Sequence, residues 1–479
     1  MPQTRYEPAA FSGYHLTAPG KPDRELTEVG PGTLCGEYLR RYWHPVCLAD
    51  ELGARPRLIR VLGEDLVLFR DRGGRLGLVH KKCPHRRASL EFGRCEARGI
   101  RCCYHGWLFD IDGAILDIPG EPADSPSAQK VMQSTRLGAY PTHEYKGLIF
   151  AYLGPPEARP RFPVYDTFEL PDTVMSPYEV RFNCNWLQVL DAIADPAHTA
   201  FLHHAQFSEG FGALGEIRFY ERHKTRFLGT ATRRVGGNVW VRVNELILPN
   251  FTQAGAAFAV DGRAPAYFGR SAFTRWVVPV DDEHCVARAW GNFGPRADPP
   301  EWNTPEGLQR IEQGEPVERS YAQRQLSPGD IEAVEGMGAI ADHDNEHLVS
   351  SDRGVALYRR RLRRLCRDLA DGQAPPQPAD LAPGVIPTYG SDTVIKSPRG
   401  DGDGDGNGDG NDGDGGGDGD SDGGGNGDGD GDGDGNGNAD SAQLNRINDQ
   451  VMEVLFSADD LQGEARDRFV IDKLRQLSR

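Results

Sequence analysis

Residues 83–107, CPHRRASLEFGRCEARGIRCCYHGW, contain the side chains that decide the fold of this region. Cys83 and His85 are spaced C-x-H, and Cys102 and His105 are spaced C-x2-H, with sixteen residues between the two pairs. Turn-forming residues accompany each pair, which predicts two hairpin loops that approach each other from one end of a sheet. Because thiolates and imidazoles suit zinc or an iron-sulfur cluster, the stretch predicts a metal centre.

The spacing favours an iron-sulfur cluster of the Rieske type. A classical zinc finger places its His residues together on a helix, whereas each loop here offers one Cys and one His. In a Rieske centre two Cys bind one iron and two His bind the other. Cys103 is an alternative to Cys102, because Cys103 is spaced C-x-H from His105; we favour Cys102, which makes the longer second loop. A structural zinc site is the competing hypothesis.

Short strand-like runs separated by turns surround this stretch and predict an antiparallel β domain over residues 41–155. The runs occupy residues 57–71, 75–83, 108–120 and 145–154. Residues 1–40 are interpreted as a lead-in to this domain. A Pro-rich segment at residues 155–165 predicts the boundary with the next domain.

A second group of potential metal ligands lies in NWLQVLDAIADPAHTAFLHH, residues 185–204, which reads as helical. On a regular helix of about 100° per residue, Asp195 and His198 share one face, whereas His198 and His203 diverge by about 140°. A metal bound by both His residues therefore requires a π-type bulge or a helix end between them. Such irregularities are frequent at functional sites.

A third ligand for the same metal is expected from SPGDIEAVEG, residues 327–336. Asp330 lies at the start of a helical run, and two His with one carboxylate form the facial triad of non-haem ferrous oxygenases, which leaves positions open for dioxygen. Some candidates rank lower: His204, Glu332 and Glu335 as competing ligands, and Asp191 and Asn185 as groups that orient the ligands.

The same part of the chain predicts an α+β domain over residues 165–385, in which helices cover an antiparallel sheet. Strand patterns occupy residues 238–250 and 272–290. Helical spacing of Leu and Val returns at residues 355–371, where a run of Arg is interpreted as the solvated face of an amphipathic helix.

The net charge of −17 comes largely from one low-complexity tract. Residues 401–440 contain fourteen Asp and no Lys or Arg, so the rest of the chain carries only −3 and shows no basic footprint for nucleic acid. Gly, Asp and Asn cannot build a core, so residues 400–440 are predicted to form a disordered linker. The tract lacks the Glu and the flanking helices of a calcium-binding EF-hand. Residues 441–479 are predicted to form a helical tail.

The chain is expected to be a cytoplasmic protein that does not enter a membrane. The first twenty residues lack the basic start and apolar run of a secretory signal. Nothing in the sequence approaches eighteen uncharged apolar residues. The nine Cys are interpreted as reduced thiols and metal ligands rather than as a disulfide framework.

The motifs CPH with RCCYHGW, then DPAHTAFLH, then EHLVSSDRGVALYRRRL resemble those of Rieske non-haem iron oxygenases. The resemblance is to the catalytic (alpha) subunits, in particular the phthalate-dioxygenase-like group, and covers most of residues 30–370. It implies an N-terminal all-β Rieske [2Fe-2S] domain followed by a helix-grip (START/Bet v1-like) antiparallel-sheet catalytic domain. It also implies a head-to-tail homotrimer. The low-complexity tract is not a family feature.

The resemblance assigns roles to individual residues. The implied cluster ligands are Cys83, His85, Cys102 and His105, and the implied ligands of the mononuclear iron are His198, His203 and Asp330. Asp195 matches the carboxylate that links a ligand histidine of the iron to a cluster histidine of the neighbouring subunit. Three positions depart from the family: Arg87 stands where Gly is common, Asp191 replaces a more usual Glu, and Cys103 replaces a common Pro or other residue.

The function implied is that of a terminal oxygenase component, which activates dioxygen at a mononuclear Fe(II) to hydroxylate a small, carboxylated aromatic substrate. Electrons would come from NAD(P)H through a separate flavin and iron-sulfur reductase, because the chain has no dinucleotide fingerprint. An alternative within the class is a Rieske monooxygenase that performs O- or N-demethylation. An alternative from another class is a Rieske electron-transfer protein without oxygenase activity.

Overall fold

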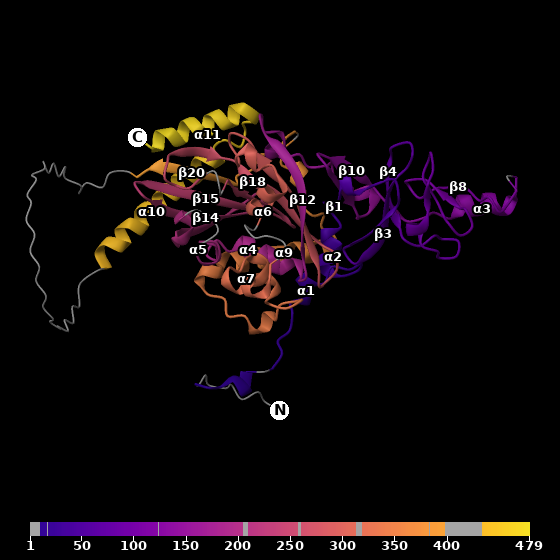
Figure 1. Ribbon diagram of the computed structural model, residues 1–479, viewed down its shortest axis with the longest axis horizontal. Helices are drawn as coiled ribbons and strands as arrows, with labels where there is room; N and C mark the ends of the chain where they lie inside the picture. The colour runs from indigo at the N-terminus through magenta and orange to yellow at the C-terminus, as the bar shows by residue number, and fades with distance from the viewer. Residues whose placement is uncertain are drawn as a thin grey trace, which may run out of the picture.

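The computed structural model describes residues 10–16, 18–122, 124–204, 209–256, 260–312, 319–382, 384–397 and 434–479. Two parts lie side by side along the long axis of the molecule, an N-terminal β unit and a larger unit in which a sheet lies against helices (Figure 1). Among the described residues, none of the helices combines the length and the apolar composition of a membrane span.

The N-terminal β unit consists of small antiparallel sheets. One contains β1 (Trp43–Leu48), β11 (Leu148–Tyr152) and β10 (Thr142–Tyr145). The next contains β2 (Arg57–Val61), β3 (Glu64–Arg70), β4 (Leu76–His80) and β9 (Ala139–Tyr140), and the last contains β5 (Arg94–Cys95), β6 (Ile100–Arg101), β7 (Leu108–Phe109) and β8 (Ile115–Asp117). Helix α3 (Pro126–Ser134) belongs to this part, whereas α1 (Arg24–Thr27) and α2 (Leu34–Leu39) pack against helices of the larger unit.

Strand β3 joins two cores of this unit because its side chains alternate between the faces of the sheet. Leu66 and Leu68 pack into a core that continues into the larger unit. Val67 and Phe69 pack into a separate core that also contains the buried Cys83 and Cys102. The predicted metal-binding loops are therefore anchored in a hydrophobic core of their own.

The larger unit is built on an antiparallel sheet in the order β12-β19-β18-β16-β15-β14-β13, with β20 paired to β15 and β17. Its strands are β12 (Val174–Phe182), β13 (Glu216–Arg222), β14 (Arg226–Val235), β15 (Asn238–Ile247), β16 (Phe251–Gly255), β17 (Ala266–Gly269), β18 (Ser271–Pro279), β19 (Cys285–Phe293) and β20 (Ser391–Lys396). The helices of this unit are α4 (Trp186–Ala194), α5 (Thr199–Leu202), α6 (Pro305–Glu312), α7 (Tyr321–Leu326), α8 (Asp330–Glu335), α9 (Arg353–Ala370), α10 (Asp434–Phe456) and α11 (Gly463–Leu477).

Helices α4 and α9 cover the inner face of the sheet. On β14 the ring of Phe227 meets that of Tyr358 on α9 edge to face, with 6.3 Å between centroids. Two residues further along the same face, a Cβ added at Gly229 would lie 3.1 Å from Pro196, in the chain just after α4. This face therefore lies beneath the segment that contains the second group of predicted metal ligands.

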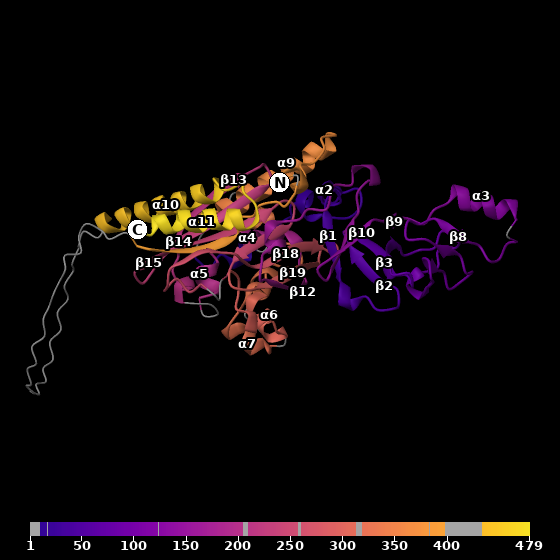
Figure 2. The same cartoon turned by 90° about the horizontal axis from the view of Figure 1, so that it is seen from above.

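The tail helices α10 and α11 cover the outer face of the same sheet (Figures 1 and 2). Their apolar residues, among them Val451, Leu455 and Val470, share a core with Leu228 of β14 and with Val241 of β15. The predicted helical tail therefore forms a third layer of the larger unit, on the outer face of its sheet.

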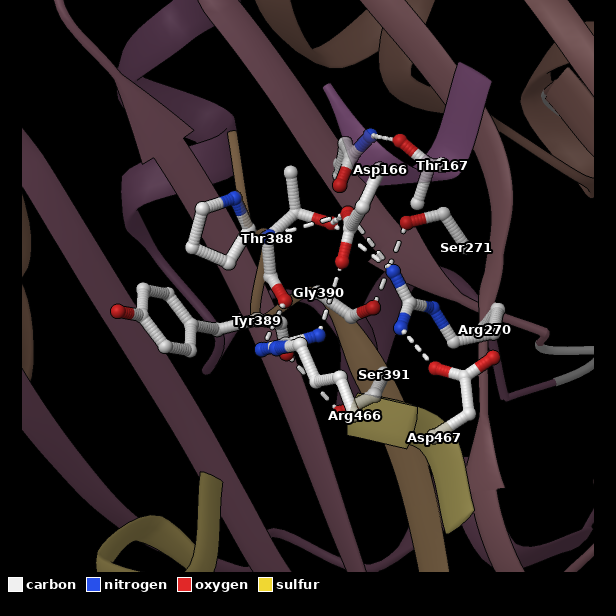
Figure 3. Close-up of polar contacts among 12 residues, drawn as sticks. Asp166, Thr167, Arg270, Ser271, Thr388, Tyr389, Gly390, Ser391, Arg466 and Asp467 are labelled. Atoms are coloured by element: carbon white, nitrogen blue, oxygen red, sulfur yellow. Dashed lines mark hydrogen bonds and ion pairs between the residues drawn. The ribbon is translucent and has the colours of Figure 1, made fainter. Parts of the chain in front are cut away.

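Buried ion pairs attach α11 to the chain around β20 (Figure 3). Asp166 lies between Arg270, at 2.8 Å, and Arg466 of α11, at 2.9 Å. Asp467 of α11 pairs with Arg270 at 2.9 Å. Arg466 also donates a hydrogen bond to the carbonyl of Thr388 at 2.8 Å. Burial alone would raise the pKa of Asp166, but Arg270 and Arg466 hold it below its ordinary value.

The predicted fold class is confirmed: an α+β chain with an N-terminal antiparallel β domain followed by a helix-covered antiparallel sheet. The predicted boundary at residues 155–165 lies between β11, which ends at Tyr152, and β12, which begins at Val174. The predicted linker lies outside the described residues over 400–433. Helix α10 begins at Asp434, within the last residues of that predicted segment.

Candidate metal centres and family

The two predicted cluster loops have matching backbone geometry. The N–H of Cys83 donates to the carbonyl of Ala88 at 2.9 Å, and the N–H of Cys102 donates to the carbonyl of Trp107 at 2.8 Å. In each loop a tight turn follows the Cys and brings the His back beside it. The rings of His85 and His105 lie 4.5 Å apart, edge to face.

Each loop turns at a residue in the left-handed region, four positions after its Cys. These residues are Arg87, with φ 65°, and Gly106, with φ 71°. Gly adopts this conformation without the steric cost that a Cβ imposes. The turn therefore explains why Gly is common in the family at the position that Arg87 occupies here, and Arg87 stays in the same backbone conformation as Gly106.

The cluster loops present the donors that a Rieske centre needs. The Cys83 and Cys102 side chains are both buried in the same hydrophobic core. Burial, together with the neighbouring thiol, raises the pKa of Cys83 to about 11. A cation is therefore needed to hold Cys83 as a thiolate at neutral pH, since metal binding displaces the thiol proton. Cys103 is exposed and points away from the pair's core.

Trp107 is a neighbour of the cluster loops that the sequence reasoning did not single out. Its ring stacks on His85 with 4.6 Å between centroids and 4° between planes. The flat stacking fixes the plane of the His85 ring. A Trp two residues after the second His is the sequence signal that could have identified this contact.

The second group of ligands lies where the predicted helix is broken. Helix α4 ends at Ala194, with Asp195 in an extended conformation, and the single turn of α5 follows. His198 immediately precedes α5 and His203 immediately follows it. The break between α4 and α5 precedes both His residues, and the helix end that lies between them is that of α5 at Leu202. The rings of His198 and His203 lie 5.3 Å apart, edge to face.

The structure brings His198, His203 and Asp330 together, with one ligand atom of each lying within 4.8 Å of the others. Oδ1 of Asp330 lies 3.3 Å from Nε2 of His203 and 3.6 Å from Nε2 of His198. Within the described residues this oxygen is buried without a hydrogen-bond partner. A buried carboxylate oxygen that faces two imidazole nitrogens fits a divalent metal with a two-His, one-carboxylate ligand set.

Electrostatics keep Asp330 ionised. Burial alone would raise the pKa of Asp330, but the neighbouring His203 and His198, and then Arg275, lower it well below its ordinary value. Arg275 lies on the inner face of β18 and is buried. The carboxylate is therefore available as a metal ligand throughout the physiological pH range.

Asp195 shapes the turn between α4 and α5. Its Oδ1 accepts a hydrogen bond from the N–H of Ala197 at 2.8 Å, and its carbonyl lies 2.5 Å from Nδ1 of His198. The Nδ1–H of His198 thus donates to a backbone oxygen, which leaves Nε2 directed at Asp330. Asp195 remains partly exposed, with 23% of its side chain accessible.

The lower-ranked ligand candidates point elsewhere. His204 is exposed, and its Nδ1 lies 2.7 Å from the carbonyl of Phe201. Glu332 pairs with Arg319 at 2.7 Å. Glu335 accepts a hydrogen bond from the N–H of Asn183 at 2.7 Å. These contacts leave Asp330 as the carboxylate at the two His residues.

The residues expected to orient the ligands have other partners. Asn185 caps α4, because its Oδ1 accepts a hydrogen bond from the N–H of Leu187 at 3.0 Å. Asp191 pairs with Arg359 of α9 at 2.5 Å. Gln188, which the sequence reasoning missed, instead connects α4 with the end of α8: its Nε2 donates to the carbonyl of Val334 at 2.8 Å. A buried Gln on a predicted helix gives little signal of such a contact in the sequence.

Comparisons with known proteins agree with this arrangement. Residues 42–140 match the family model of the Rieske [2Fe-2S] domain. The chain is 43% identical over 418 residues to the tert-butanol monooxygenase / tert-amyl alcohol desaturase oxygenase subunit of Aquincola tertiaricarbonis, a match that covers 81% of this chain and 86% of the relative. It is 37% identical to the phenoxybenzoate dioxygenase subunit alpha of Ectopseudomonas oleovorans, over 74% of this chain and 88% of the relative.

The fold is also similar to that of a solved structure. The crystal structure of dicamba monooxygenase bound to dicamba matches with a TM-score of 0.54 at 18% identity, over 70% of this chain and 99% of that chain. A Rieske domain followed by a helix-covered antiparallel sheet defines a class of iron-dependent oxygenase. The chain belongs to the Rieske non-haem iron oxygenases, as the terminal oxygenase (catalytic) subunit.

Proposed function

We propose that this subunit carries a cluster and a mononuclear Fe(II) on the residues that the motifs indicate. The proposed cluster ligands are Cys83, His85, Cys102 and His105, and the proposed iron ligands are His198, His203 and Asp330. The observation that carries the proposal is the buried Oδ1 of Asp330, which faces both imidazoles without a hydrogen-bond partner among the described residues.

When bound, the cluster supplies single electrons and the ferrous ion supplies the reductive activation of dioxygen. The protein holds the reacting groups in place. The bond from Nδ1 of His198 to the Asp195 carbonyl fixes the tautomer that presents Nε2. Burial of His203 and of Oδ1 of Asp330 limits the access of water to the site.

Metal analysis tests the proposal directly. We expect about three irons and two acid-labile sulfides per chain, with the visible absorption and low-field electron resonance of a reduced Rieske cluster. One zinc without sulfide would refute it. His198→Ala discriminates against a pure electron-transfer protein, because an electron carrier would keep its full function after this substitution.

We further propose that the working unit is a homotrimer in which Asp195 links the iron site of one subunit to the cluster of its neighbour. The sheets that carry the cluster loops lie in the opposite part of the molecule from α5 (Figure 1), which supports transfer between subunits rather than within one chain. We expect a particle about three times 52.6 kDa in mass. Asp195→Asn should allow reduction of the cluster but slow its reoxidation in turnover; an unchanged reoxidation rate argues against the bridge.

The proposed reaction is hydroxylation of a small aromatic substrate, with a carboxylated ring as the first choice. The phenoxybenzoate dioxygenase relative supports this choice, whereas the tert-butanol relative, named for a substrate without a ring, supports monooxygenation as the second candidate. Labelled dioxygen separates the two reactions. Both atoms in one organic product indicate dioxygenation, and one atom indicates monooxygenation, including O- or N-demethylation.

We propose that the electrons come from NAD(P)H through a separate flavin and iron-sulfur reductase. We also propose that the protein acts in the cytoplasm, in the breakdown of aromatic compounds. The free thiols of the nine Cys support a reducing compartment. Turnover by this chain with NADH alone would overturn the requirement for a reductase.

A further inference from the structure

A chain of ion pairs connects the helix that leads to Asp195 with α9 and with the protein surface. Asp191 lies on α4, one turn before Asp195. Its Oδ2 accepts hydrogen bonds from Nε and Nη2 of Arg359 on α9, at 3.0 and 2.5 Å. The same guanidinium donates to both carboxylate oxygens of Glu346, at 2.5 and 3.0 Å. We call Asp191, Arg359 and Glu346 the α4 clamp.

The α4 clamp is not arranged for greatest stability. Oδ1 of Asp191 is buried without a hydrogen-bond partner among the described residues. Burial, with the negative charges of Glu346 and Asp23, outweighs the effect of Arg359 and raises the pKa of Asp191 to about 6. Because such a group is a poor stabiliser, it calls for an explanation in function.

The turn that carries Asp195 and His198 is joined directly to the end of α4, because the N–H of Asp195 donates to the carbonyl of Ala192 at 3.3 Å. The turn after α4 is held together internally, since Asp195 bonds both the N–H of Ala197 and the ring of His198. The end of α4 also touches α9 directly: a Cβ added at Gly354 would lie 2.1 Å from the carbonyl oxygen of Ala194. The position of the turn that carries Asp195 and His198 therefore depends on the position of the end of α4.

We propose that the α4 clamp is a positioning device for the iron site. Asp191, held by Arg359 and Glu346, fixes the end of α4 and so sets where Asp195 and His198 lie. This inference rests on the proposed function, because it assumes that Asp195 and His198 lie on the electron path. Asp191 acts through these residues and is a positioning residue rather than a catalytic one.

The outer side of the clamp is accessible from solvent. Glu346 and Arg359, together with His343 and Asp23, line an open cleft of about 680 Å³. The clamp can therefore be weakened at Glu346, 26% of whose side chain is exposed, without altering the buried face of α4. Glu346→Gln tests the clamp even where a buried substitution prevents folding.

The test uses reduced holoenzyme mixed with dioxygen and either phenoxybenzoate or tert-butanol, with cluster oxidation followed by absorbance. Asp191→Asn should slow oxidation about tenfold, and Glu346→Gln about threefold, because misplacements of 1 Å cost up to about a hundredfold. Asp191→Glu should recover the rate to within about threefold of wild type. Arg360→Gln, on the same exposed turn of α9, is the matched control and should behave as wild type.

The pH profile separates positioning from a purely structural role. The charged and titratable groups that face Asp191 are Arg359 and Tyr358 of α9, Glu346, and Asp23 before α1. Protonation of Asp191 weakens its bond to Arg359, so wild-type oxidation should fall below about pH 6. The Asn variant should lack this limb of the profile.

Two further readouts make the outcome decisive. Cluster reduction by dithionite and the iron content should stay unchanged in the variants, whereas the electron resonance of the nitric oxide adduct of Fe(II) should change in Asp191→Asn only. Wild-type rates and adduct spectra in both Asp191→Asn and Glu346→Gln overturn the positioning role. Absence of mononuclear iron from the wild-type protein is a separate result that overturns the proposed function.

Discussion

The buried ion pairs of Figure 3 make a quantitative prediction about how the tail is held. Asp166→Asn removes the carboxylate that lies between Arg270 and Arg466, both of which have side chains only 1% exposed. Arg270 keeps Asp467 as a partner, whereas Arg466 keeps a hydrogen bond to the Thr388 carbonyl and cation–π contacts with Phe268 and Tyr389. Loss of one partner from a buried pair costs about 3–5 kcal/mol, and we expect this cost here.

The reverse substitution, Arg466→Met, should cost less. Asp166 then still accepts hydrogen bonds from the N–H and Oγ1 of Thr388, at 3.1 and 2.5 Å, and keeps its ion pair with Arg270. We expect about 1–3 kcal/mol, the value of hydrogen bonds to a charged group. The costs of Asp166→Asn and Arg466→Met thus differ by about 2 kcal/mol. This corresponds to about a thirtyfold difference between the two variants in the equilibrium constant for the opening of α11.

Hydrogen exchange of peptides from residues 463–477, measured by mass spectrometry, reports this opening. Arg468→Met is the matched control on the same helix, because Arg468 is 73% exposed and lies 3.7 Å from Glu464, a surface pair worth about 0–1 kcal/mol. Exchange that is as fast in Arg466→Met as in Asp166→Asn would refute the assignment of Asp166 as the centre of the network.

Three further outcomes are expected. Cys102→Ser should abolish the Rieske electron resonance signal whereas Cys103→Ser should retain it; loss of the signal in both variants would contradict the choice of ligand. Asp330→Asn should lower the iron content from about three to about two per chain with the cluster spectrum intact, as measured by metal analysis. Because the folded-state pKa of Asp166 lies below 3.8, its ionised form stabilises the folded protein above about pH 4, and this contribution is lost as the pH falls further. Urea denaturation should therefore show a steeper acid loss of stability in wild type than in Asp166→Asn, and equal slopes would argue against the linkage.

Local patterns in the sequence were sufficient for much of the fold and for the grouping of the metal ligands. Cys83 and Cys102 lie in short loops whose turn residues are visible in the sequence. The angular mismatch between His198 and His203 predicted a bulge or a helix end between them, and α5 ends there, at Leu202. Asp330 lies far along the chain, yet its position at a helix start and the chemistry of the triad were enough to select it.

Contacts between distant segments could not be predicted in this way. The pairing of Asp191 with Arg359 depends on how α4 crosses α9, and Arg359 is not distinguished from the other Arg residues of its helix. The docking of the tail depends on an outer sheet face that carries Val241 and Leu228, residues that are equally typical of an inner face. The side chains of Gln188 and Arg466 obtain their roles only from partners that the fold brings near.

Arg234, near the end of β14, has a consequence for the evolution of the low-complexity tract. Its guanidinium contacts Ser397, the last described residue before the tract. It also donates hydrogen bonds to Asp440 and Gln443, at 2.6 Å each, which follow the tract. The segments before and after the tract both contact this one side chain. The tract therefore does not have to span a fixed distance, and that distance does not set its number of residues. Doubling a closed loop costs only about 0.6 kcal/mol. Repeat expansion or contraction by replication slippage would be close to neutral here, and the same position would accept a genetically inserted reporter.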